Sequence, residues 1–282
     1  LNDTTVFQDL SSDSIVSWQW DFGDGNTSTL QNPSHLYASC DSFLVKLIVV
    51  DIHGCNDTTE KYITVWCLPQ ASFTANLVCE GDTTTVESTS VAGNEPSAPI
   101  ISWDWSFTNN TSSIVNHLFI PCNNYIEELI VTDANGCKDT TPGTITVHCN
   151  PNASYNVDDE CYDNEQQPIE FYDASNNGSA PINYWQWTIS GGNYVFPYNQ
   201  DSANTQFHFN SCGLKNFSLY VRDANNCEDS ISGSVNVWCE PIASFNAAPV
   251  CLNDTTVFQD LSSDSIVSWQ WDFGDGNTST LQ

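Results

Sequence analysis

The sequence contains no methionine, and basic residues are scarce: five lysines and arginines stand against 35 aspartates and glutamates, a formal net charge of −30. Such a chain repels the phosphates of nucleic acids and the anionic surface of a membrane, so we predict neither as a partner. Long apolar runs are also absent, which predicts no membrane span. Charged residues make up only 14% of the chain and hydrophobic residues 40%, a balance typical of a folded protein rather than of a disordered acidic tail.

Motifs of the common enzyme classes are absent as well. No Gly-x-Ser-x-Gly, His-Glu-x-x-His or phosphate-binding loop occurs in the sequence. His35, His117 and His208 recur at matching places along the chain, which favours a role in the scaffold over a role as a catalytic base. We therefore predict that the chain is not an enzyme and that it needs no cofactor.

Calcium is the one metal that the acidic turns suggest. The EF-hand spacing is absent, and aspartate is common in turns because its side chain accepts hydrogen bonds from the turn backbone. A specific calcium site is therefore a weaker interpretation than simple turn capping. The candidate ligands are Asp21, Asp24, Asp51, Asp158 and Asp159.

The stretch LNDTTVFQDLSSDSIVSWQWDFGDGNTSTLQ occurs twice, at residues 1–31 and again at residues 252–282, without one change. The offset between the two copies predicts a repeat period of 251 residues. Since no methionine is present at which translation could begin, we expect the chain to be an internal segment of a much longer secreted protein.

The twelve cysteines follow a second, shorter repeat. Spacings of 15, 12 and 12 residues recur three times, starting at Cys40, Cys122 and Cys212, and they predict three homologous units with four cysteines each. The absence of any Cys-x-x-Cys pair disfavours zinc. Evenly patterned cysteines instead predict disulfides and an oxidising, extracellular compartment.

Each unit shows the pattern of short β-strands. Residues 42–55 (SFLVKLIVVDIHGC) and 63–67 (ITVWC) read as two strands of a hairpin, with Gly54 in a turn that needs a positive φ. In residues 17–25 (SWQWDFGDG), aromatic side chains alternate and so point to one face of a strand. Six or seven such strands without helical periodicity predict an antiparallel β-sandwich, with the tryptophans in its core.

The runs WDFGDG (residues 20–25), NPSHLY (32–37) and VKLIVVDIHGC (45–55) resemble the PKD domain, the immunoglobulin-like repeat named after the polycystic kidney disease protein. The other two units lack the Gly-Asp-Gly turn and share the Trp-x-Trp strand and the cysteine frame. The resemblance implies an all-β chain of tandem antiparallel immunoglobulin-like sandwiches in a head-to-tail array. The expected boundaries are 1–67 for unit one, which lacks its first strand, 68–149 for unit two, 150–239 for unit three, and 240–282 for the opening half of the next unit one.

The cysteine spacing predicts two kinds of disulfide. Pairs 27 residues apart flank the hairpin and should close within a unit: Cys40–Cys67, Cys122–Cys149 and Cys212–Cys239. In an immunoglobulin-like topology, the first cysteine of a unit and the cysteine in its hairpin turn lie about 30 Å apart, and a disulfide needs Cα atoms within about 7 Å. We therefore predict links between neighbouring units, which would stiffen the array. The cysteines concerned are Cys79 with Cys227, Cys251 with the turn cysteine of the next copy, Cys137 with a cysteine before residue 1, and by the same rule Cys55 and Cys161.

The resemblance also implies a function and a location. Similar giant PKD-repeat proteins are secreted or surface products of gliding, often marine, bacteria that use type IX secretion. We predict an extracellular or cell-surface filament or appendage that serves adhesion, gliding or prey capture and whose partners are copies of itself, in tandem or as a homo-oligomeric bundle. The alternative is a carbohydrate- or calcium-binding adhesin repeat with a cell-surface or glycan target.

Overall fold

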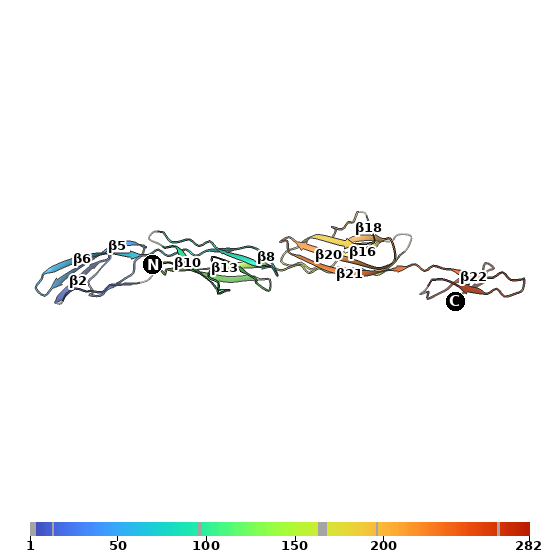
Figure 1. The fold of residues 1–282 in the computed structure, drawn as a ribbon, viewed down its shortest axis with the longest axis horizontal. Helices are drawn as coiled ribbons and strands as arrows, with labels where there is room; N and C mark the ends of the chain where they lie inside the picture. Colours follow the sequence, from blue (N-terminus) through green and yellow to red (C-terminus); the bar gives the residue numbers. More distant parts are fainter. Residues whose placement is uncertain (1–3, 13, 95–97, 163–167, 196, 264–265) are drawn as a thin grey trace. The chain divides into compact units, whose positions relative to one another are not determined.

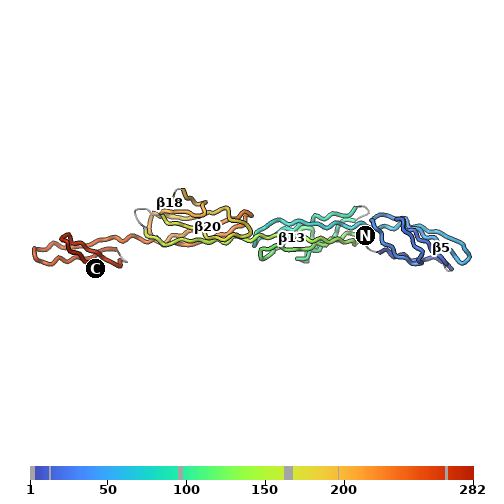
Figure 2. Tube along the Cα trace, turned by 180° about the vertical axis from the view of Figure 1, so that it is seen from behind, coloured from blue at the N-terminus to red at the C-terminus, as the bar shows by residue number. Residues whose placement is uncertain are grey.

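The computed structural model describes residues 4–12, 14–94, 98–162, 168–195, 197–263 and 266–282. Every regular element in these ranges is a β-strand, as the sequence predicts, and none of their residues forms a helix able to cross a membrane. The chain divides into two compact parts, Leu1–Cys149 and Asn150–Gln282. Within each sandwich the long strands run side by side in both views (Figures 1 and 2).

Unit one is a sandwich with one large sheet and one small one. The large sheet has the order β3-β2-β5-β6, and β1 pairs with β4 in the small sheet. Apolar side chains that alternate along β5 pack against Trp20 and Phe22 to form the core. The strands are β1 (Thr5–Val6), β2 (Ile15–Asp21), β3 (Thr27–Ser28), β4 (Ser34–His35), β5 (Asp41–Asp51) and β6 (Asn56–Val65).

Unit two repeats this plan and adds a first strand. One sheet has the order β10-β12-β13-β8, and the other has the order β11-β9-β7. Its core is separate and is built around Trp105, Leu129 and Val131. The strands are β7 (Phe73–Ala75), β8 (Val78–Cys79), β9 (Thr84–Ser88), β10 (Ile100–Trp105), β11 (Ile114–His117), β12 (Asn124–Asp133) and β13 (Lys138–His148).

Unit three has two four-stranded sheets, β15-β21-β20-β17 and β14-β16-β19-β18. Trp187, Phe217 and Leu219 lie in its own core, so the described residues form three separate hydrophobic cores, each within one predicted unit. The strands are β14 (Tyr155–Asn156), β15 (Glu160–Tyr162), β16 (Ile169–Asp173), β17 (Ile182–Ile189), β18 (Gly192–Tyr194), β19 (Thr205–Phe209), β20 (Gly213–Asp223) and β21 (Glu228–Cys239).

Residues 240–282 form only part of a sandwich. β22 (Phe245–Ala247) pairs with β23 (Phe258–Asp260), and β24 (Trp271–Asp272) pairs with β25 (Thr278–Ser279). No hairpin equivalent to β5–β6 follows in the described residues of this segment. Its aromatic side chains consequently stay partly exposed, for example Phe258 at 37%.

A buried or half-buried aspartate fixes the hairpin turn in each of the three units. Asp133 Oδ1 accepts hydrogen bonds from the backbone N–H groups of Asn135 and Cys137. Asp223 and Asp51 make the same bonds in their turns. The turn residue takes a positive φ in every case, +81° at Gly54, +83° at Gly136 and +66° at Asn226. This explains why only glycine and asparagine occupy that position.

Glu127 stands where the other two units have Val45 and Phe217, and the sequence leaves open whether that position faces solvent. Val45 and Phe217 are buried, whereas Glu127 is half-buried within β12. Ser106 Oγ donates a hydrogen bond to the Glu127 carboxylate. The position therefore faces the core side of the strand, and the hydrogen bond offsets part of the cost of burying a carboxylate.

Candidate functional site

Three disulfides close the open ends of the three hairpins. They join Cys40 to Cys67, Cys122 to Cys149 and Cys212 to Cys239, with Cα atoms 5.0, 4.9 and 5.0 Å apart. In each case one cysteine comes just before the first strand of the hairpin and its partner lies at or just after the end of the second. These are the three pairs that the constant spacing of 27 residues predicts.

The structure places the first cysteine of a unit far from the turn cysteine of the same unit. Cys79 lies in β8, which runs parallel to the last residues of β13, so that Cys79 is in register with His148. Cys137 lies at the other end of β13, an 11-residue strand that spans about 36 Å at about 3.3 Å per residue. A disulfide between Cys79 and Cys137 is therefore excluded by geometry. The links between neighbouring units stay predictions.

The aspartates proposed for calcium are engaged in local hydrogen bonds. Asp21 Oδ1 accepts from the backbone N–H of Gly23 at 2.9 Å, and Asp159 Oδ1 accepts from the backbone N–H of Asn236 at 2.8 Å. Asp51 caps its hairpin turn, and Asp158 lies beside Asp159 in an exposed loop. In the part of the chain that the structure describes, no three His, Cys, Asp or Glu side chains are grouped so as to hold a metal ion.

Asp24 instead pairs with a histidine. His35 Nε2 lies 2.7 Å from Asp24 Oδ2, and the His35 ring stacks on Phe22 with centroids 4.2 Å apart and meets the edge of Tyr37 at 4.6 Å. Burial alone would raise the pKa of Asp24, but the hydrogen bonds from His35 and from Asn26 outweigh it and lower the pKa. His117 likewise packs against Phe107 and Phe119. These contacts fit the scaffold role that the recurrence of the histidines predicts.

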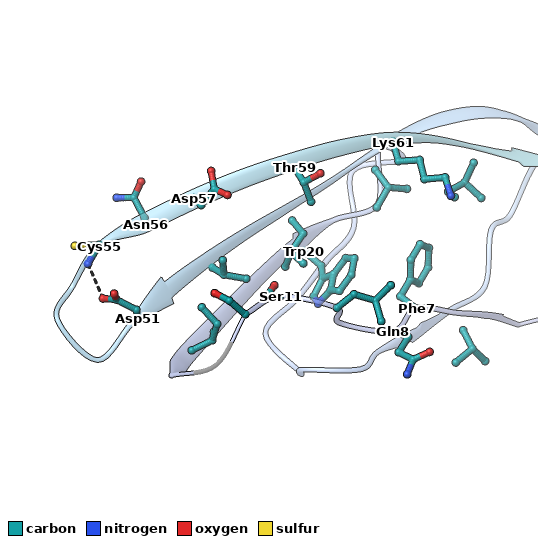
Figure 3. A pocket seen from close by; sticks show the side chains of 18 residues that line it. Phe7, Gln8, Ser11, Trp20, Asp51, Cys55, Asn56, Asp57, Thr59 and Lys61 are labelled. Atoms are coloured by element: carbon teal, nitrogen blue, oxygen red, sulfur yellow. Dashed lines mark hydrogen bonds between the residues drawn. The ribbon is translucent and has the colours of Figure 1, made fainter.

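A cavity of about 670 Å³ opens on the face of unit one (Figure 3). Val45, Leu47 and Val49 of β5 line it together with Phe7 and Trp20, and so do several residues of β6. Figure 3 shows Asp57, Thr59 and Lys61 following one another along β6 beside it. Sequence reasoning did not single out Asp57 or Lys61, although their alignment with Asp139 and Gly143 of unit two was a signal that could have found them.

Comparisons with known proteins match parts of the chain. A family model described as PKD domain matches residues 2–65. Pre-pro-metalloprotease PrtV of Vibrio cholerae is 40% identical over 112 residues, which cover 38% of this chain and 12% of that protein. Collagenase ColQ1 of Bacillus cereus is 51% identical over 51 residues, 18% of this chain and 5% of the collagenase. The chain thus spans a small part of the length of these relatives.

Solved structures with immunoglobulin or related domains in tandem also align with the chain. An I-band fragment from titin is 12% identical to this chain. The alignment covers 85% of this chain and 94% of the titin fragment, with a TM-score of 0.42. The eight N-terminal Ig domains of Down Syndrome Cell Adhesion Molecule are 14% identical to this chain. The alignment covers 87% of this chain and 34% of that structure, with a TM-score of 0.40.

Proposed function

We propose that the chain is a structural repeat of a long extracellular filament or appendage. The starting point is that residues 2–65 match a family model described as PKD domain. The observation that carries the proposal is the succession of three sandwiches with separate cores, each with a disulfide closing its hairpin. An identical 31-residue sequence then begins the series again. In such an array each unit needs only its neighbours, so length can increase without any redesign of the unit.

An extracellular location is supported by two independent observations. The disulfides form in an oxidising compartment. The similar proteins described above are a pre-pro-metalloprotease and a collagenase. We propose that such an appendage serves adhesion, gliding or prey capture. We also propose that it is exported by type IX secretion. Lateral bundling of chains with a net charge of −30 would require salt or divalent cations to screen their repulsion.

Electron microscopy of the native secreted material tests the array directly. The longest strand of unit one, β5, has 11 residues and spans about 36 Å, so three units predict an axial period of about 105–120 Å. Continuous rods with that period would support the proposal. Compact particles, or strings that bend freely at every unit, would contradict it.

A disulfide between neighbouring units is the part of this proposal that would make the array stiff. We propose that Cys79 of unit two bonds to Cys227 of unit three, because each is too far from its alternative partner within its own unit. Peptide mapping of the unreduced protein should recover the two cysteines in one cross-linked fragment. A fragment that joined Cys79 to Cys137 would contradict the proposal.

A second candidate function is an accessory region of a secreted protease. The 40% identity over 112 residues to a metalloprotease of Vibrio cholerae favours it. Mass spectrometry of the native polypeptide that carries this sequence distinguishes the two candidates. Peptides of a protease domain in the same polypeptide would favour the accessory region, and further copies of the 251-residue period would favour the array.

A further inference from the structure

The outer face of the hairpin sheet in unit three carries a group of side chains that we call the tyrosine–arginine cluster. Tyr184 of β17 and Arg222 of β20 are cross-strand partners, and the Arg222 guanidinium lies over the Tyr184 ring, 4.9 Å from its centroid. Tyr220 meets Tyr184 edge-on, with ring centroids 6.0 Å apart. Glu228, opposite Arg222 on β21, completes the cluster. The four side chains project away from the core, because residues that alternate with them along the strands, such as Leu219, fill it.

The scaffold does not require this cluster. Units one and two build the same sheet with other kinds of residue at the positions of the two tyrosines and the arginine. Because those units form their cores without these three side chains, the cluster is available for a role outside the fold. The equivalent residues are Ser17 and Ser102 for Tyr184, Ile48 and Ile130 for Tyr220, and Val50 and Thr132 for Arg222.

The polar groups of the cluster are only partly engaged within the protein. In the described ranges, the Arg222 guanidinium forms neither an ion pair nor a hydrogen bond, so its N–H donors are open to a ligand. Burial and the hydrogen bond of its hydroxyl to Glu228 raise the pKa of Tyr220 to about 12. The Glu228 carboxylate still has lone pairs that can accept from a ligand. Donors and an acceptor side by side suit hydroxyl groups, which both donate and accept.

A shallow hollow of about 340 Å³ continues the same face beyond the cluster. Thr188, Ser218 and Ser232 lie next to one another across β17, β20 and β21 and line it. They are four residues along their strands from Tyr184, Arg222 and Glu228, which is about 13 Å. Their hydroxyls make no hydrogen bond with any other described residue. A ligand that covers the cluster and the hollow is therefore elongated and rich in hydroxyl groups.

An added strand makes this face rigid. β18 has no counterpart in the corresponding sheet of unit two, and it extends that sheet of unit three beyond β19. The Tyr194 hydroxyl at its end donates to the carbonyl of Trp187 at 2.7 Å, and the backbone N–H of Trp187 donates to the carbonyl of Gln200 at 2.7 Å. The segment after β18 thus fixes the outer edge of β17, the strand that carries Tyr184. A site on fixed strands loses little freedom when a ligand binds.

Charge selects between neutral and acidic ligands. Arg222 and Glu228 balance each other, and Gln186, Thr188 and Ser218 beside them are uncharged. The chain as a whole carries a formal charge of −30. Its field repels a polyanion but not a neutral ligand. The face therefore favours a neutral ligand.

We infer that the tyrosine–arginine cluster and the hollow beside it form a binding site for a neutral oligosaccharide. Tyr184 and Tyr220 supply apolar ring surface for the C–H groups of one sugar ring. Arg222 donates to the hydroxyls of that sugar, and Glu228 accepts from them. The hydroxyl groups of the hollow bind the sugars that follow. The inference deepens the adhesion included in the proposed function, and it rests on that function only in placing the ligand outside the cell.

Isothermal titration of the full chain with cellohexaose, laminarihexaose and mannohexaose tests the site. We expect saturable binding of at least one of these neutral hexasaccharides, with one molecule bound per chain. Hexagalacturonate carries a carboxylate on every ring and should bind more weakly than the best neutral probe. The absence of saturable binding by all three neutral probes would overturn the inference. So would binding of hexagalacturonate that is as tight as that of the best neutral probe.

Three substitutions locate the ligand with residues that unit two already has at the same positions. Tyr184→Ser, Tyr220→Ile and Arg222→Thr should each weaken binding about tenfold, because each removes ring surface or charged hydrogen-bond donors. Circular dichroism should show all three variants folded as the parent. Binding that none of the three substitutions weakens would place the ligand elsewhere and overturn the inference.

The matched control lies in unit two. Thr132→Val changes the position equivalent to Arg222 and introduces the residue of unit one, Val50. We expect the affinity for the hexasaccharide to stay the same. A loss as large as that of Arg222→Thr would mean that binding does not depend on the cluster, and it would overturn the inference.

Failure of this site and failure of the proposed array give different results. If a neutral hexasaccharide bound with the stated pattern and electron microscopy found no axial period, the binding site would be supported and the array would be wrong. If rods with the expected period bound none of the three neutral probes, the array would be supported and the binding site would be wrong.

Discussion

Residues 1–31 and residues 252–282 have the same sequence but different neighbours, and they show what that sequence encodes by itself. Trp18 Nε1 donates to Asp9 Oδ2 at 2.6 Å in the first copy, and Trp269 Nε1 donates to Asp260 Oδ2 at 2.8 Å in the second. The Gly-Asp-Gly turn also repeats its hydrogen bonds. Local hydrogen bonding is therefore independent of the surroundings.

Burial differs sharply between the two copies. Phe22 is 2% exposed and its equivalent Phe273 is 38% exposed, and Phe7 is 8% exposed against 37% for Phe258. The hairpin β5–β6 covers the first copy, and no equivalent hairpin covers the second in the described residues. The core is thus created by the hairpin and not by the repeated sequence.

Truncating the same phenylalanine in each copy should give the largest difference. Phe22→Ala leaves a cavity beneath the hairpin and should lower the free energy of unfolding of unit one by about 3–5 kcal/mol. Phe273→Ala removes a side chain that is already partly exposed and should cost at most about 1 kcal/mol. Hydrogen–deuterium exchange of peptides from residues 41–65 and 258–282 measures the two effects separately, which matters because a chain with several domains does not unfold in one step.

Equal losses of protection in the two variants would contradict the comparison, because they would mean that burial by the hairpin adds nothing to the stability of the repeated sequence. The exchange of residues 124–148 of unit two serves as the internal control and should change in neither variant.

Much of this fold can be predicted from the sequence, because local patterns encode it. The alternation of Trp18, Trp20 and Phe22, the positive φ of Gly54 and the spacing of 27 between paired cysteines each depend on a few neighbouring residues. The inward position of Glu127 could not be predicted in the same way. It depends on which residues lie across the sheet, such as Ser106, whose hydroxyl donates to Glu127, and a strand pattern does not specify its partner.

Removing the disulfide of unit one should destabilise the hairpin β5–β6, which covers the first copy of the 31-residue sequence. Cys40→Ser with Cys67→Ser opens a loop whose ends are 27 residues apart, and the expected loss is about 2–4 kcal/mol from the greater freedom of the unfolded hairpin. Exchange of residues 41–65 should rise, while exchange of residues 258–282 stays unchanged. Cys55→Ser, at an exposed cysteine that forms no disulfide in this structure, is the matched control, and a loss as large as that of the double variant would refute the prediction.

Acid should destabilise unit one through Asp9. Burial alone would raise the pKa of Asp9, but hydrogen bonds from Ser11, Trp18 and Gln31 lower it from 3.8 to about 2. Because the pKa is lower in the folded state, the stabilisation is complete above the unfolded value near 3.8 and is lost as the pH falls through about 2. Exchange of residues 15–21 at several values of pH measures the loss. Asp9→Ser, which copies Ser88 at the equivalent place in unit two, should remove this pH dependence, and an unchanged profile would assign it to another group.

The smallest expected effect is a difference in pKa response between Asp24 and its equivalent Asp275. The two aspartates lie in the same turn sequence. The pKa of Asp24 is lowered against the effect of burial by His35 and Asn26, whereas the pKa of Asp275 is lowered by its backbone and side-chain hydrogen bonds with Asn277. His35→Phe keeps a ring stacked on Phe22 and removes only the hydrogen bond, so the pKa of Asp24 should rise while that of Asp275 stays fixed. Carboxyl NMR titration of both aspartates in one sample measures the shift. If the two pKa values moved together, the change would reflect an effect on the whole chain. The His35 hydrogen bond would then make no specific contribution to the pKa of Asp24, and the prediction would be wrong.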